Sequence, residues 1–181
     1  MTFDSRAFRD ALGCFPTGIA VVTASSEAAG GEMSHIGITV NSFTSVSLDP
    51  PLVLWCIDRR SRRYPAFAGA GGFTVSILAS GHRAVSARLA GQGEHSLDGI
   101  ALVPTELGPP ALADALAVFE CARESVQDCG DHAILVGRVL RFRRHDGGAR
   151  CVVEPVHRFL PLSPLRPACA AAPPPGRWRR S

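Results

Sequence analysis

The chain contains no lysine, and all 19 of its basic residues are arginines. This absence excludes a Schiff-base enzyme, a pyridoxal phosphate enzyme with its lysine, and a lysine-bearing P-loop. The sequence also lacks the Gly-x-Gly-x-x-Gly fingerprint, the Gly-x-Ser-x-Gly elbow and the His-Glu-x-x-His pair, which mark a Rossmann dinucleotide site, a serine hydrolase and a zinc protease. An enzyme without an evident nucleophile, metal or acid pair is best suited to chemistry that a cofactor supplies.

The sequence has no long apolar segment and no paired cysteines. No apolar run approaches the roughly 20 residues that span a bilayer, and the N-terminus lacks the basic and apolar regions of a signal peptide. We therefore expect a cytoplasmic protein without a membrane partner. The six cysteines form no Cys-x-x-Cys pair and have no metal-ligand spacing. They predict free, mostly buried thiols and no metal site.

The positive charge is concentrated at the C-terminal end. Residues 164–181 hold four arginines and no acidic residue, so the rest of the chain carries fifteen arginines against sixteen acids, a net charge of −1. A nearly neutral domain lacks the excess of basic residues that binds nucleic acid. With 46% hydrophobic and 19% charged residues, residues 1–163 predict one globular domain. Residues 164–181, rich in Pro, Ala and Arg and without periodicity, predict a disordered tail.

The pattern of apolar residues and turn residues predicts a mainly β fold with three short helices. Asp4 or Ser5 can cap a helix that ends before Gly13, a second helix is expected at about 64–68, and Ser80 can cap a third that runs to about 90. The segment 92–112 is expected to be irregular, and 141–144 with 151–153 could form a hairpin. Strands are expected at 19–23 and from about 35, and a third strand is expected to end at the Asp-Pro-Pro break at 49–51. Further strands are expected at 52–57, 73–78, 116–126 and 133–140. Such short strands joined by turns favour a closed or partly open antiparallel barrel.

The segment 37–58 combines strand-forming residues with many polar side chains. Its hydroxyl and amide groups alternate with apolar anchors such as Ile38 and Val46. A core strand would not carry so many groups that need hydrogen-bond partners. The pattern is suited to a rigid wall against a flat, polar-edged, phosphorylated ligand; the alternative is an ordinary Ser/Thr-rich hairpin.

Two further segments could bind an anion. Arg59–Arg63 places four arginines around one serine, which is either an anion cradle or a solvated basic loop. Ser80–Arg83 opens a predicted helix, where the macrodipole favours a phosphate, or else Ser80 is only a helix cap. Arg83 and Ser86 would then share one face of that helix.

Five segments in register together resemble the flavin reductase family that supplies reduced flavin to two-component monooxygenases. They are Phe8–Gly13, Pro16–Thr23, Asn41–Ser47, Asp49–Leu54 and Gly130–His132, and the resemblance covers about residues 3–160. It implies an FMN-binding split barrel, a Greek-key-like antiparallel barrel. It also implies a homodimer with the flavin near the subunit junction, reduction of free FMN or FAD by NADH or NADPH, and a partner flavin-dependent monooxygenase.

The resemblance also implies which residues bind each cofactor. The nicotinamide would be oriented by His132, with Asp131 fixing its tautomer, and would also meet His157 and Phe159. The flavin would contact Thr39, Val40, Asn41, Ser42, Ser45, Cys56, Asp58, Ser61, Arg62, Arg83, Ser86 and Arg88. The chain departs from the family's pattern at two places. Arg63 and Tyr64 stand where a Ser-x-Thr pattern is common, and the glycine of the family's last strand is missing before Pro161.

Two other functions are compatible with parts of this pattern. A non-enzymatic flavin-binding module, acting as carrier or sensor, would share every flavin contact and differ only on the nicotinamide side; the intact Gly130–His132 motif favours the reductase. An oxidase of the pyridoxamine phosphate type is disfavoured, because that activity favours lysine and arginine contacts to phosphate and the chain has no lysine. The motifs do not distinguish FMN from FAD or NADH from NADPH.

Overall fold

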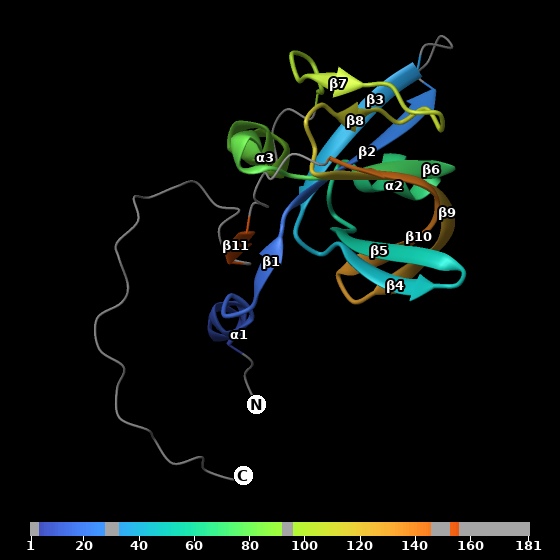
Figure 1. Cartoon of the computed structure of the whole chain (residues 1–181). Helices are drawn as coiled ribbons and strands as arrows, with labels where there is room; N and C mark the ends of the chain where they lie inside the picture. Colours follow the sequence, from blue (N-terminus) through green and yellow to red (C-terminus); the bar gives the residue numbers. More distant parts are fainter. Residues whose placement is uncertain (1–3, 28–32, 92–95, 146–152, 156–181) are drawn as a thin grey trace.

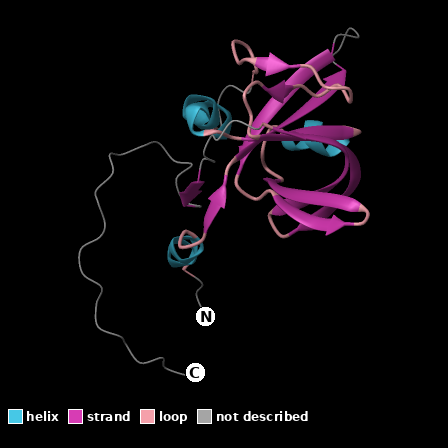
Figure 2. Cartoon of the chain, in the orientation of Figure 1, coloured by secondary structure: helices cyan, strands magenta, loops and turns pink. Residues whose placement is uncertain are grey.

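The body of the protein is a seven-stranded antiparallel sheet that curls into a partly open barrel (Figures 1 and 2). The computed structural model describes residues 4–27, 33–91, 96–145 and 153–155. In sheet order the strands are β3 (Met33–Val40), β2 (Ala20–Glu27), β6 (Gly72–Ile77), β9 (Ala117–Cys129), β10 (His132–Arg144), β5 (Pro51–Asp58) and β4 (Thr44–Leu48). The predicted mainly β architecture with short helices is confirmed. The division at 163/164 and the tail lie outside the described residues.

Two small ribbons and three short helices complete the described chain. The ribbons pair β1 (Pro16–Gly18) with β11 (Val153–Pro155) and β7 (Leu102–Val103) with β8 (Ala111–Leu112). Of the predicted hairpin of 141–144 with 151–153, residues 151 and 152 lie outside the described residues. Residues 141–144 belong to β10 and pair with β9, and Val153 pairs with Gly18 of β1. The helices are α1 (Ser5–Leu12), α2 (Tyr64–Gly69) and α3 (Arg83–Ala90).

The helix caps follow the sequence at α1 and differ from it at α3. Asp4 accepts hydrogen bonds from two N–H groups of the first turn of α1, at 2.9 and 3.2 Å, as its position before the helix predicts. Ser80 does not cap α3. Residues Ser80–His82 form a separate 3-10 turn, in which the ring of His82 accepts from the N–H of Ala79 at 3.1 Å. The α-helix proper then begins at Arg83. No helix of the described residues is long and apolar enough to cross a membrane.

Two clusters of buried side chains hold the sheet together. Inside the barrel, Trp55 packs edge-on against Phe67 of α2 and Phe73 of β6, with ring centroids 5.0 and 5.8 Å apart. These edge-to-face pairs stabilise the core beyond their buried area. The second cluster joins the sheet to α3 and to the β7–β8 ribbon. It consists of Ile19, Val21, Leu78, Leu89, Leu97, Ala111, Leu112, Ala115 and Val118.

The four described cysteines are free thiols, as predicted, but only one of them is buried. Cys121 lies in the barrel core, where burial raises the pKa of its thiol to about 12. Cys56 is half-buried, and Cys14 and Cys129 are exposed. For the described cysteines the expectation of mostly buried thiols is therefore wrong, because Cys14 lies in the connection between α1 and β1 and Cys129 is the last residue of β9.

Gly137 allows β10 to pass close to the core. A Cβ at this position would overlap the ring of Phe73 and lie 2.9 Å from Cβ of Cys121. The register of β9 and β10 shifts between Val136 and Gly137, so the strand bends where the ring approaches the backbone. The close approach requires glycine here, because both neighbours are buried and cannot move aside.

We expect Gly137→Ala to destabilise the protein by about 1–3 kcal/mol, because the added methyl overpacks the core. Gly69→Ala is the matched control. It sits at the end of α2, where no described atom lies within 4 Å of the added Cβ, and it should change the stability by about 1 kcal/mol or less. Urea unfolding followed by tryptophan fluorescence measures both. Equal stability of the two variants would contradict the packing of Gly137 against Phe73.

Candidate functional site

Three predicted segments meet at one end of the barrel. β3 ends at Val40, and residues 41–43 then carry the chain from one edge strand of the sheet, β3, to the other, β4. β5 ends at Asp58, and its neighbour β10 begins at His132, which lies directly opposite Asp58. The polar segment after β3, the arginine-rich loop after β5 and the Gly130–His132 turn are therefore neighbours, although they are far apart in sequence.

Ser42 joins residues 41–43, the connection from β3 to β4, to the strand β5. Its hydroxyl accepts the N–H of Cys56 at 2.9 Å and donates to the carbonyl of the same residue at 3.3 Å. The side chain thus replaces the two ladder bonds that an adjacent strand would make. Burial raises the pKa of the Cys56 thiol, which keeps it protonated and excludes it as a nucleophile.

The other predicted residues of this segment differ in exposure. Thr39 is buried, and its hydroxyl donates to the carbonyl of Ser86 at 2.9 Å, which joins β3 to α3. Val40 is buried in the barrel core, Asn41 is half-buried and Ser45 is exposed. The hydroxyls of Thr39 and Ser42 are therefore engaged within the protein, whereas Asn41 and Ser45 present polar groups at the surface.

A cavity of about 610 Å³ lies between the loop after β5, the strand β3 and the C-terminal end of α3. Three of the predicted flavin residues line it: Asp58, Ser61 and Arg62. Arg60 holds Asp58 with its N–H at 2.8 Å and with its guanidinium at 3.3 Å. These hydrogen bonds, the backbone N–H first, lower the pKa of Asp58. The complete lining is Ile38, Ile57, Asp58, Arg60, Ser61, Arg62, Arg63, Ala90 and Gly91.

Arg63 was predicted only as one of the four arginines of a loop that is either an anion cradle or solvated. Its side chain is buried, with 6% of the residue exposed. Its guanidinium donates to the carbonyls of Gly37 at 3.1 Å, Leu89 at 2.6 Å and Gly91 at 2.5 Å. It thereby caps the C-terminal end of α3 and ties it to β3. The signal in the sequence was the departure itself, an arginine where the family's pattern has a threonine.

The three predicted flavin contacts on α3 do not line the larger cavity. Arg83 is exposed at the first residue of the helix, while the cavity borders the opposite end, at Ala90 and Gly91. Arg88 donates to the carbonyls of Asp98 and Ser96 at 2.8 and 2.9 Å. Arg83, Ser86 and Arg88 are not among the residues that line the cavity, so their contact with a flavin stays a prediction.

Next to this cavity, Gly130 and Asp131 of the Gly130–His132 turn border a second, shallower one of about 440 Å³. Its other lining residues are Arg59, Arg60 and Tyr64, so that Arg60 borders both cavities, and His132 is not among the lining residues of either. Gly130 has a φ of 65°, a left-handed conformation that glycine adopts without strain.

The Asp131–His132 pair has the predicted geometry. Oδ1 of Asp131 lies 2.8 Å from Nδ1 of His132, and this hydrogen bond lowers the pKa of Asp131. The N–H of Arg59 also donates to the carbonyl of Asp131 at 3.0 Å, which anchors the turn to the loop after β5. His157 and Phe159, the other predicted nicotinamide contacts, lie outside the described residues.

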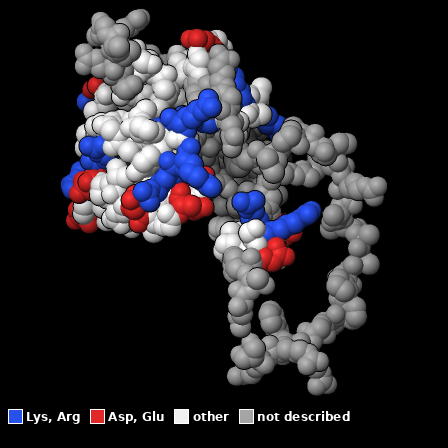
Figure 3. Space-filling model, turned by 180° about the vertical axis from the view of Figure 1, so that it is seen from behind, with Lys and Arg blue, Asp and Glu red and all other residues white. Residues whose placement is uncertain are grey.

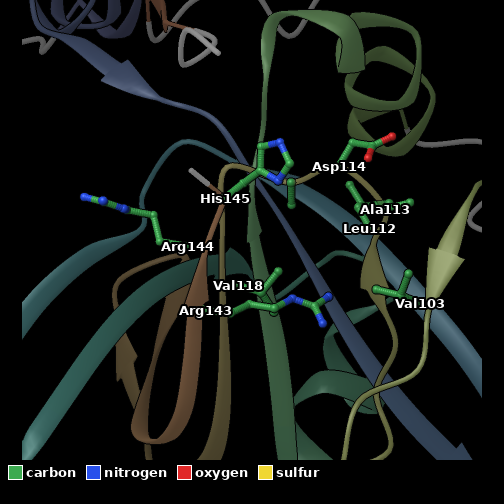
Figure 4. A pocket seen from close by; sticks show the side chains of 9 residues that line it. Val103, Leu112, Ala113, Asp114, Val118, Arg143, Arg144 and His145 are labelled. Carbon is green, nitrogen blue, oxygen red and sulfur yellow. The ribbon is translucent and has the colours of Figure 1, made fainter. Parts of the chain in front are cut away.

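Figure 4 shows a third hollow, of about 260 Å³. Val103, Leu112 and Val118 form its apolar part, and Arg143, Arg144 and His145 come from the end of β10. It contains none of the residues expected to bind a cofactor. On the face seen in Figure 3, arginines and acidic residues are interspersed, with no continuous basic stripe. Within the described residues, no group of three His, Cys, Asp or Glu side chains is placed to hold a metal ion.

Comparison with known proteins agrees with this arrangement. The family described as flavin reductase like domain matches residues 12–156. The chain is 45% identical over 148 residues to the FMN reductase (NADH) SmoA of Agrobacterium fabrum, covering 82% of each chain. It is 38% identical over 136 residues to the flavin-dependent monooxygenase reductase subunit HsaB of Mycobacterium tuberculosis, covering 75% of this chain and 70% of that one.

Solved structures show the same fold. The NADH:FAD oxidoreductase SgcE6 of Streptomyces globisporus, in complex with NAD and FAD fragments, matches with a TM-score of 0.77 and 32% identity, over 91% of this chain and 98% of that one. Two further curated relatives, both from Rhizobium meliloti, are longer, and the chain spans 44% and 60% of their lengths. The expected split barrel is confirmed by these matches together with the sheet order.

Proposed function

Because the chain belongs to the family of flavin reductase-like domains, we propose that it reduces free flavin, in the first place FMN, with NADH. The reduced flavin is then supplied to a partner flavin-dependent monooxygenase. The chain is an oxidoreductase of this family. The preference for FMN and NADH rests on the 45% identity to a relative that is named for both. The observation that carries the proposal is the meeting of a polar wall, a cationic cavity and the Asp131–His132 pair at one end of the barrel.

The residues of the larger cavity fit a phosphorylated flavin. Ser61 offers a hydroxyl, and the exposed Arg62 offers a guanidinium at its rim. Nε of Arg63 is buried without a hydrogen-bond partner, which is uncommon for a buried donor. Hydroxyls and guanidinium groups are the usual ligands of a phosphate. We assign Ser61 and Arg62 to the phosphate, and Asn41 and Ser45 to the polar edge of the ring.

A bound flavin supplies the hydride acceptor, so the protein contributes position and exclusion of water. Ser42 and Thr39 hold the wall rigid through their bonds to Cys56 and Ser86. With Nδ1 of His132 engaged by Asp131, Nε2 is the ring atom that can accept a hydrogen bond from the nicotinamide carboxamide. The tautomer is thus set by the neighbouring carboxylate.

The direct test is NADH oxidation by the purified protein with and without added FMN. We expect steady turnover only when flavin is added, a rate that saturates with FMN, and a lower kcat/KM with NADPH. Flavin fluorescence measures binding in the same samples. If flavin is bound but NADH is not consumed, the chain is a non-enzymatic flavin-binding module, and the proposal fails.

Replacing His132 should impair the use of NADH and spare the flavin. We expect His132→Ala to lower kcat/KM for NADH by roughly 10-fold or more, because a misplaced nicotinamide loses rate steeply, while the Kd for FMN stays unchanged. Asp131→Asn should give a smaller loss in the same direction. His35→Ala is the control, since this exposed histidine pairs with Ser25 of β2, five residues before the end of β3. An unchanged kcat/KM in His132→Ala would refute the assignment.

We further propose that the protein is a homodimer. α1 buries none of its residues and stands beside the barrel (Figure 1), and Leu12 and Phe15 at its end are 45% and 72% exposed. Exposed apolar groups in such number mark a contact surface. Light scattering should give twice the chain mass of 19.1 kDa, and Leu12→Ser with Phe15→Ser should shift the protein toward monomers. A monomeric wild-type protein at micromolar concentration would contradict the dimer.

A further inference from the structure

Arg63 carries a charge that the structure only partly compensates. Two other arginines of the loop form ion pairs. Arg59 pairs with Asp128 and Arg60 with Asp58, each at 3.3 Å. Among the described residues, no carboxylate lies within ion-pair distance of Arg63; its three partners are carbonyls. The carbonyl end of α3 offers partial negative charge, but a buried full charge is costly without a true counter-ion.

Arg63 also belongs to the wall of the 610 Å³ cavity, which it lines together with Ser61 and Arg62. Its Nε has no hydrogen-bond partner and is itself buried, so Arg63 acts on a ligand in the cavity through its charge. A charge at a buried site acts on a neighbouring anion with less screening than an exposed one. Arg62 is exposed, so an anion in the cavity would be attracted more strongly by Arg63 than by Arg62.

We propose that Arg63 recognises the phosphate of the bound flavin and so makes the site prefer FMN to riboflavin. The phosphate is the counter-ion that the buried guanidinium lacks. Arg63 therefore has two tasks, because the nitrogens Nη1 and Nη2 hold α3 against β3 while its charge attracts the ligand. The inference rests on the proposed function in so far as the ligand is a flavin.

A structural role alone makes a different prediction. If Arg63 only capped α3, its loss would loosen the cavity wall and raise the dissociation constants of FMN and riboflavin by the same factor. If it also recognises the phosphate, its loss weakens the binding of FMN more than that of riboflavin, which has the same ring and ribityl chain without the phosphate. The ratio of the two dissociation constants therefore separates the roles.

The experiment measures binding of FMN and riboflavin to the full-length protein by flavin fluorescence, without nicotinamide. The variants are Arg63→Met, which removes the charge, Arg63→Lys, which keeps it, and Arg60→Met. Arg60→Met is the matched control, because Arg60 lines the same cavity but is paired with Asp58. We expect Arg63→Met to raise the Kd of FMN roughly 10- to 100-fold more than the Kd of riboflavin. Arg63→Lys should keep most of the preference, and Arg60→Met should keep the ratio within about threefold.

An equal loss for both ligands in Arg63→Met, or an unchanged ratio, would overturn the proposal. Should that variant not fold, Arg63→Gln replaces it, because the amide still donates to the carbonyls but carries no charge. The outcome is independent of turnover. A protein that binds FMN through Arg63 yet never oxidises NADH refutes the reductase and leaves this inference standing. A protein that reduces both flavins and binds them equally keeps the reductase and refutes the inference.

Discussion

Side chains that hydrogen-bond to backbone groups hold the open end of the barrel together. Ser42 satisfies both polar groups of Cys56, Thr39 reaches the carbonyl of Ser86, and Arg63 collects three carbonyls from β3 and the end of α3. Buried polar groups of the backbone must find partners. Because the ladder ends here and the chain crosses from one sheet edge to the other, these partners have to come from side chains, and they fix the geometry of the cavity.

This constraint divides the polar residues of the site into two groups. Thr39 and Ser42 are engaged inside the protein and give the wall its rigidity. Asn41 and Ser45, with Ser61 at the cavity, retain polar groups that a ligand can meet. A site that contributes position more than chemistry needs both groups, since donors hold a ring in place only when their own positions are fixed. The Asp131–His132 pair follows the same principle on the neighbouring cavity, where a carboxylate orients the ring.

The sequence predicted what depends on local pattern. A continuous apolar run located the strand from Leu52 to Ile57, a long strand was expected from Leu116 to Val126, and polar residues before a helix placed its cap at Asp4 or Ser5. It did not predict features that depend on distant pairing. The ribbon of β1 with β11 joins residues from opposite ends of the domain, and no periodicity encodes that. Burial of Arg63 runs against the usual exposure of arginine, so the local pattern left both an anion cradle and a solvated basic loop open.

The account centres on the place where the flavin lies, and a crystal structure of the protein with FMN tests this most directly. The account predicts the ring along residues 41–45 and the phosphate within hydrogen-bonding distance of Ser61 and Arg62, in the cavity that Arg63 lines. Flavin bound instead in the hollow formed by Val103, Leu112 and Arg143, with the cavity beside Arg63 empty, would contradict it.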